Sequence, residues 1–320
     1  MKRKINKVGQ NTLTISLPNT WVKKNQIKPG EELEVLEDGP NLHVTRNKKW
    51  FDSNRAIVNV EHMSKFMLNR TLSALYTYGF QEIEVRYKEQ ELFDYKTQRK
   101  VSVEDYIKEL LTKLLGLEVI SHSKDKILLH AFIKDFEPKE LEMTIRRIYY
   151  LTKEFLDSFI VAMQTDFEPF FQRYYLFHDN ISKFNFYSQR MLYLSDYDER
   201  VKGKIFALLT LIDKTMDTIR HLAERVNELK HITKTVQEEL KNLFIWFLRL
   251  FEFYLSETSK MEEFEDIVKE RYLLMQHINK TKFPHETERV ISEAKWILDC
   301  MNEFIEASIY LHIDNFKSNI

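Results

Sequence analysis

The residues best suited to binding chemistry lie at the start of the chain, where positive charge is concentrated. The first 49 residues contain ten Lys or Arg and five Asp or Glu, a net charge of +5, whereas the whole 320-residue chain carries −1. All five acidic residues fall between Glu31 and Asp38, so the segment before them is purely basic. Clustered positive charge suits the phosphates of nucleic acid, but a solvated, lysine-rich terminus without a partner has the same composition. The basic residues are Lys2, Arg3, Lys4, Lys7, Lys23, Lys24, Lys28, Arg46, Lys48 and Lys49.

Catalytic chemistry has no comparable support in the sequence. There is no HExxH motif, no phosphate-binding glycine loop, no nucleophile elbow and no paired Cys and His, so we expect the protein not to be an enzyme. Cys300 is the single cysteine, which excludes an internal disulfide and fits a reducing cytoplasm. The N-terminus also lacks the apolar core of a signal peptide, so we expect a cytoplasmic protein.

The most apolar stretch covers residues 243–255 and is interrupted by Arg249 and Glu252. It is shorter than the roughly 20 apolar residues that a membrane-spanning helix needs, so we expect no membrane span. A helix that is apolar on nearly every face is buried on nearly every face, either inside a bundle or in a dimer seam. The alternative is a docking face for a membrane transporter.

The basic segment must be positioned by short strands. Leu13, Ile15 and Leu17 alternate with polar residues, Gly9 separates them from an earlier apolar run, and Pro18 ends the strand and starts a helix over 19–25. Two further strands are predicted over 31–37 and 41–46. About 46 residues with so little secondary structure cannot bury much surface alone, so we expect the segment to interleave with a second copy in a homodimer or higher oligomer.

In order along the chain, these features resemble the swapped-hairpin DNA-binding domain of the SpoVT–AbrB family. The matching features are the basic start, Val8-Gly9, Leu17-Pro18, Trp21, Lys28-Pro29-Gly30-Glu31 and the strands around Val35 and Val44. The resemblance implies that residues 1–49 dimerise and bind double-stranded DNA. Phosphate contacts would give affinity, while Arg3 and Asn11 are the candidates for reading base edges. The implied contact residues are Lys2, Arg3, Lys4, Lys7, Asn11, Lys23 and Lys24.

The rest of the chain divides into two parts, so the predicted fold class is multidomain α+β. Residues 55–134 show the order β-α-β-α-β-β, which predicts a small α/β sandwich with helices on one side of a sheet. A polar stretch over 88–100 receives no element, and Ser102 is a predicted N-cap. From residue 137 to 320 the pattern is wholly helical. The predicted helices lie near 137–166, 167–194, 199–231, 233–256, 259–280 and 285–313.

A weak internal repeat relates the two halves of the helical part. Leu211-Ile212-Asp213…Asp217 recurs 86 residues later as Ile297-Leu298-Asp299…Glu303, which predicts two related three-helix bundles. Together with the segments 75–85, 115–119 and 146–151, this half resembles a PhoU domain. The whole chain resembles archaeal phosphate-uptake regulators that join an AbrB-like head to a PhoU-like tail.

That resemblance implies a homodimeric, DNA-binding transcriptional regulator of phosphate uptake. The alternative is a PhoU-like signalling adapter whose helical half binds a phosphate transporter or a kinase, with the N-terminal domain serving mainly for dimerisation.

The resemblance also implies a carboxylate-held metal site, because PhoU-like bundles are associated with metal clusters. Asp213 and Asp217 are one turn apart and face the same way, as Asp299 and Glu303 do, and hard oxygen ligands suit Mg, Mn or Fe. Asp179 is the third candidate in the first bundle. The stretch from His178 to Ser182 is poorer in acids than the family pattern, which predicts a degenerate site. The alternative is a solvated ion-pair face that continues through Arg220 and Glu224.

Overall fold

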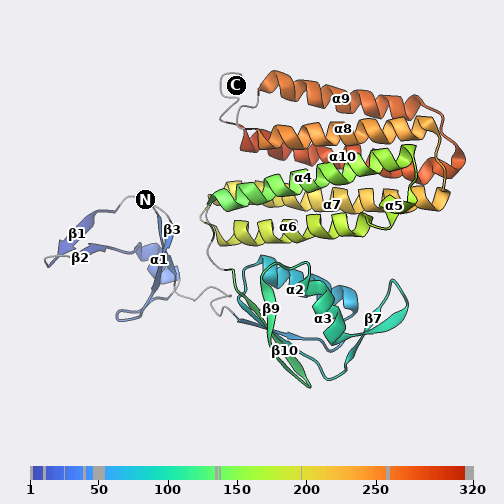
Figure 1. The fold of residues 1–320 in the computed structure, drawn as a ribbon. Coiled ribbons are helices and arrows are strands. Elements are labelled where there is room, and N and C mark those ends of the chain that lie inside the picture. Colours follow the sequence, from blue (N-terminus) through green and yellow to red (C-terminus); the bar gives the residue numbers. More distant parts are fainter. Residues whose placement is uncertain are drawn as a thin grey trace. The chain divides into compact units, whose positions relative to one another are not determined.

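The computed structural model describes residues 3–9, 12–24, 26–38, 41–45, 55–133, 136, 138–195, 197–256 and 260–313. The chain forms two compact units, Met1–Asn54 and Arg55–Ile320, each of which is described by itself (Figure 1).

The N-terminal unit consists of two hairpins and a short helix, as predicted. Strands β1 and β2 pair antiparallel, and β3 and β4 form a second antiparallel pair. Trp21 of α1 is half-buried, and every residue of this unit whose burial the structure describes is half-buried or exposed. The unit therefore has no hydrophobic core of its own among these residues. Its elements are β1 (Ile5–Val8), β2 (Thr12–Ile15), α1 (Asn19–Lys24), β3 (Glu34–Asp38) and β4 (Asn41–Thr45).

The second unit begins with an α/β part built on a four-stranded sheet. The strand order is β5-β6-β10-β9, with β5 parallel to β6 and the other neighbours antiparallel. Helices α2 and α3 pack on one face of this sheet around a core that includes Leu68, Ile83 and Ile107 (Figure 1). The elements are β5 (Arg55–Asn59), α2 (Lys65–Thr77), β6 (Glu82–Arg86), β7 (Glu91–Asp94), β8 (Arg99–Ser102), α3 (Val103–Leu111), β9 (Leu117–Ser123) and β10 (Lys126–Ala131).

Local signals set the helix starts in this part, but one hairpin escaped prediction. Ser102 caps α3 as expected, since its Oγ accepts a hydrogen bond from the amide of Asp105 at 3.2 Å. The prediction that residues 88–100 contain no element was wrong, because they hold β7 and the first half of β8. The inward positions of β7 are Leu92 and the charged Asp94, whose partner Lys65 lies 3.3 Å away. A buried carboxylate at an inward position hides the alternation that marks a strand.

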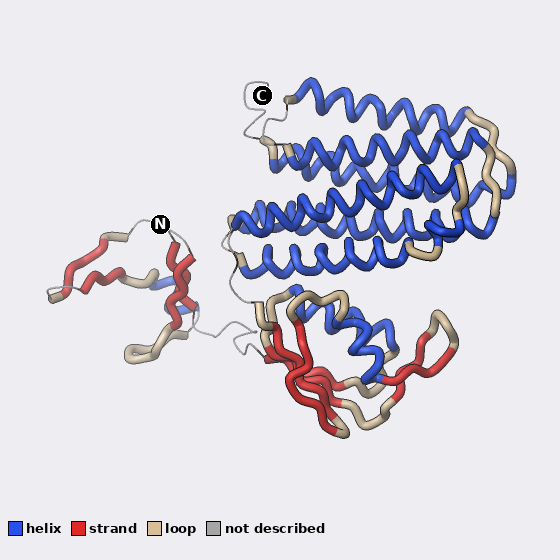
Figure 2. Tube along the Cα trace, viewed as in Figure 1, coloured by secondary structure: helices blue, strands red, loops and turns tan. Residues whose placement is uncertain are grey.

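The helical part follows the predicted boundaries closely. Figure 2 shows long helices lying side by side, and one hydrophobic core runs through them. The predicted helix over 167–194 is two helices, because Pro169 starts a short one and the chain turns at Gln172 and Arg173 before the next. The helices are α4 (Pro138–Gln164), α5 (Glu168–Phe171), α6 (Tyr174–Leu194), α7 (Glu199–Leu229), α8 (Lys234–Leu255), α9 (Met261–Lys280) and α10 (Glu288–Leu311), which follows the 3₁₀ turn η1 (His285–Thr287).

The apolar stretch over 243–255 lies in α8, and most of its side chains are buried in the bundle, as expected. No helix in the described part of the chain combines the length and apolarity that crossing a membrane requires. The 86-residue repeat is visible in the element boundaries, because the shift carries α6 onto α9 and the start of α7 onto η1.

A buried arginine fixes the helical part to the α/β part. Arg190 of α6 is 1% exposed, and its Nη1 donates hydrogen bonds to the carbonyl oxygens of Tyr76 at 2.6 Å and Phe80 at 3.1 Å. These carbonyls lie where α2 ends and the chain turns through Gly79, which has φ +95° and lies against Leu194. The two parts thus share an interface that desolvates a charge, which makes them one body.

We expect Gly79→Ala to destabilise the protein by about 1–2 kcal/mol, because an L-residue is strained at positive φ and its Cβ would meet Leu194 Cδ2 at 2.7 Å. Gly203→Ala is the matched control. Gly203 lies in α7 with no neighbour within 4 Å of the added Cβ, so this change should stabilise by about 0.5–1 kcal/mol. Urea denaturation measures both. Equal effects of the two substitutions would contradict the role given to Gly79.

Candidate functional site

The candidate nucleic-acid interface is the basic surface of the N-terminal unit. Arg3 and Lys4 precede β1, Lys7 lies within β1, and Lys23 and Lys24 form the last turn of α1. All five side chains are exposed. The predicted contacts Lys2 and Asn11 lie outside the described residues. The described cations therefore come from two elements, a strand and a helix end, that are available to a polyanion.

Exposed apolar side chains lie on the same hairpin. Ile5 is opposite Ile15 and Lys7 is opposite Leu13, so Ile5, Ile15 and Leu13 project from one face of the β1–β2 ribbon. These three side chains are 65%, 56% and 67% exposed. We call them the apolar hairpin face. An isolated two-stranded ribbon is marginally stable in water, so this face requires a covering surface.

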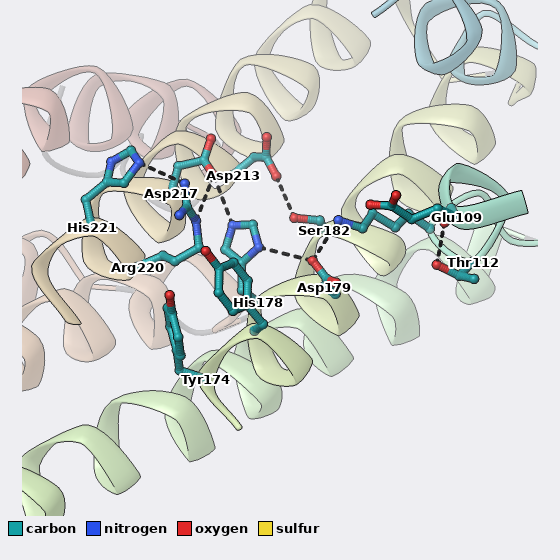
Figure 3. A network of polar contacts seen from close by, with 12 residues as sticks. Glu109, Thr112, Tyr174, His178, Asp179, Ser182, Asp213, Asp217, Arg220 and His221 are labelled. Carbon is teal, nitrogen blue, oxygen red and sulfur yellow. Dashed lines mark hydrogen bonds and ion pairs between the residues drawn. The ribbon is translucent and has the colours of Figure 1, made fainter. Parts of the chain in front are cut away.

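The second candidate site is a polar cluster between α6 and α7, called the His178 cluster (Figure 3). Its central imidazole lies between two carboxylates: Nε2 is 3.0 Å from Asp217 Oδ1, and Nδ1 is 3.5 Å from Asp179 Oδ1. Asp179 is also 2.8 Å from Lys113 Nζ, which belongs to the α/β part. The members are His178, Asp179, Ser182, Asp213, Asp217 and Arg220.

The electrostatics of the cluster favour an imidazolium. Burial opposes a charge on His178, but hydrogen bonds to Asp179 and Asp217 outweigh it and raise the pKa of His178. Burial would raise the pKa of Asp217, but its hydrogen bond to His178 and nearby Arg220 lower it. The pKa of Asp213 is raised by burial and by the charge of Asp217, and Ser182 Oγ donates a hydrogen bond to it at 3.3 Å. The cluster is thus a half-buried ion-pair network centred on the buried His178.

These residues do not fit a metal centre. Asp213 and Asp217 do face α6 together, but the ring of His178 lies between Asp217 and Asp179, where convergent ligands would be needed (Figure 3). In the second repeat, Asp299 pairs with Arg271 Nη2 at 3.2 Å, and Glu303 is exposed on α10. No three His, Cys, Asp or Glu side chains within the described ranges are grouped so that they could hold a metal ion.

The sequence did not single out His178 as the centre of this network. Its partner Asp217 is 39 residues away, so the pair depends on tertiary packing. One signal was present: His178 lies four residues before Ser182, which places both on the same face of α6.

We expect His178→Gln to lower the free energy of unfolding by about 1–3 kcal/mol below pH 6, because it removes charged hydrogen bonds to both carboxylates. The pKa of His178 is higher in the folded protein than the ordinary value of about 6.5, so this stabilisation is complete below that value and is lost as pH rises through the folded pKa. Urea denaturation from pH 5.5 to 8.5 measures it, with the exposed His231→Gln as control. A difference that grows with pH would contradict the assignment.

Comparison with known protein families supports the reading of the N-terminal unit. Residues 7–51 match the family described as "Antidote-toxin recognition MazE, bacterial antitoxin". This family is AbrB-like, so the match confirms a SpoVT–AbrB type of domain at the N-terminus, a type that typically binds DNA and dimerises. No curated protein and no solved structure matches the chain. The match does not extend into the α/β and helical parts.

Proposed function

We propose that the protein is a homodimeric DNA-binding regulator of transcription. The observation that carries this proposal is a single small unit of AbrB type that combines an exposed basic surface with an exposed apolar hairpin face. Such a unit gains its core by pairing with a second copy, and the pair doubles the positive charge offered to DNA.

The basic side chains divide the work of binding. Lys4, Lys23 and Lys24 give phosphate contacts, and each neutralised phosphate releases counterions, which makes the affinity steeply dependent on salt. Arg3 is the candidate for a bidentate contact to guanine, and Asn11 for a contact to adenine. The first set supplies affinity and the second supplies sequence preference.

The proposal also assigns a role to the second unit, Arg55–Ile320. It would receive the signal, and the resemblance of its helical half to PhoU domains makes phosphate uptake the regulated process. An adapter role toward a phosphate transporter or kinase rests on the same resemblance. A second candidate function comes from the matched family itself: an antitoxin-type role, in which this chain binds and neutralises another protein.

We expect the triple substitution Lys4→Ala, Lys23→Ala and Lys24→Ala to flatten the salt dependence of duplex binding. If all three residues contact phosphates, a dimer loses six contacts, and the slope of log K against log salt falls by about 5. Fluorescence anisotropy with a labelled duplex, from 50 to 300 mM salt, measures the slope.

The matched control for this experiment removes the same charge elsewhere. Lys269, Lys280 and Lys282 are exposed on and just after α9, and their triple alanine variant should keep the wild-type slope. An unchanged slope in the N-terminal variant, or an equal loss in the control, would exclude the N-terminal unit as the DNA contact surface.

We expect Leu13→Glu to shift the full-length protein from dimer toward monomer, because it places a charge in the apolar hairpin face. Thr12→Glu is the control, since Thr12 lies on the other face of the same strand, opposite Val8. Light scattering during size-exclusion chromatography gives the mass. A Leu13→Glu protein that remains as dimeric as the control would show that this face does not form the interface.

A further inference from the structure

A groove of about 600 Å³ lies between α8 and α9, outside both candidate sites. The helices run antiparallel, because Arg249 of α8 pairs with Glu270 of α9 while Glu239, further back along α8, lies 2.9 Å from Nε2 of His277. Ile245 and Leu273 line the groove and are 45% and 54% exposed. Two apolar side chains, one from each helix, are thus open to solvent in this groove.

The residues that line this groove have matched spacing on the two helices. Each helix contributes four positions at i, i+3, i+4 and i+7, the spacing of a seam between packed helices. In both helices the outer positions are polar and the two middle positions are apolar. The set, called the α8–α9 face, is Asn242, Ile245, Trp246 and Arg249 from α8, and Glu270, Leu273, Leu274 and His277 from α9.

We propose that the α8–α9 face is a second self-association surface, covered by the same face of another copy in an antiparallel four-helix arrangement. A two-fold axis running along the groove would place α8 of each copy over α9 of its partner. Residues at the same level along the groove would then meet. Ile245 would lie over the partner's Leu273, while Trp246, which is only 2% exposed, and Leu274 line the groove beneath them.

Charge complementarity favours a second copy as the occupant. At one end of the groove the same two-fold axis sets Arg249 against the partner's Glu270 and Glu270 against the partner's Arg249, so four charges alternate in sign. Within one chain this ion pair is about 40% exposed, with side-chain exposures of 41% and 42%. Covering it with an alternating set strengthens each attraction without leaving a charge unmatched. At the other end, Asn242 meets the partner's His277, which keeps that level polar.

This surface is independent of the N-terminal unit. Pairing through the α8–α9 face uses only helices of the second unit, so it would persist if the proposed DNA contacts were removed. Together with an N-terminal dimer, this face would either hold the same two chains together at a second contact or link one dimer to another.

Cross-linking between two distinguishable full-length copies tests the arrangement. Cys300→Ser removes the native thiol from both; one copy then carries Ile245→Cys, the other carries Leu273→Cys, and the two are co-expressed with different tags. Mild oxidation should yield a disulfide-linked product that contains both tags. The control replaces Ile245→Cys by Met143→Cys, a side chain of α4 that is 68% exposed, and should give only background.

Charge reversal then tests the proposed partner directly. Arg249→Glu in both copies, or Glu270→Arg in both, brings four like charges together and should lower the cross-link yield by at least about tenfold, since like-charge contacts cost several kcal/mol. One copy with Arg249→Glu and one with Glu270→Arg set two negative charges of one chain against two positive charges of the other, so both contacts between chains are attractive and the yield should recover.

Absence of the cross-link, a yield equal to that of the Met143→Cys control, or failure of the mixed charge pair to restore the yield would overturn the proposal. These results do not depend on DNA binding. An unchanged salt slope in the N-terminal triple variant, together with an intact cross-link, would count against the N-terminal unit alone.

Discussion

One constraint governs the N-terminal unit. The β1–β2 ribbon exposes its apolar face to water, and the described residues of the unit leave that face uncovered. A four-stranded unit of this size cannot close a core by itself. Burial of Ile5, Leu13 and Ile15 must therefore come from another surface, and a second identical ribbon offers an apolar face of the same kind. Because the exposed cations belong to the same strand and to α1, any surface that completes the fold also sets the spacing of the positive charge.

Unlike the N-terminal unit, the second unit has hydrophobic cores of its own, one in the helical part and one in the α/β part. Arg190 joins them by binding the carbonyls that end α2, and Lys113 reaches Asp179 across the same boundary. Arg190 is 1% exposed, so the first contact is desolvated, whereas Lys113 and Asp179 are 29% and 40% exposed and form a partly solvated ion pair.

Local chemistry explains which features could be predicted from sequence. Caps such as Ser102 predicted where helices start, and most predicted helix boundaries were correct. The 86-residue repeat was predicted from a short pattern of apolar and acidic residues that recurs along the chain. The β7–β8 hairpin was missed because the partner of Asp94, Lys65, lies 29 residues earlier in the chain. His178 was missed as the centre of a network for the same reason. The metal expectation came from family resemblance rather than from the residues, and the ion pairs of His178 occupy the place where ligands would have to converge.

The most direct test of the central claim is the stoichiometry of the protein–DNA complex. Mass measurement of full-length protein bound to a short duplex at low ionic strength reports the number of chains per duplex. The account predicts two chains, or a multiple of two, on each duplex, with no complex that contains a single chain. One chain per duplex, or no complex at low salt, would contradict a unit that needs its second copy in order to bind.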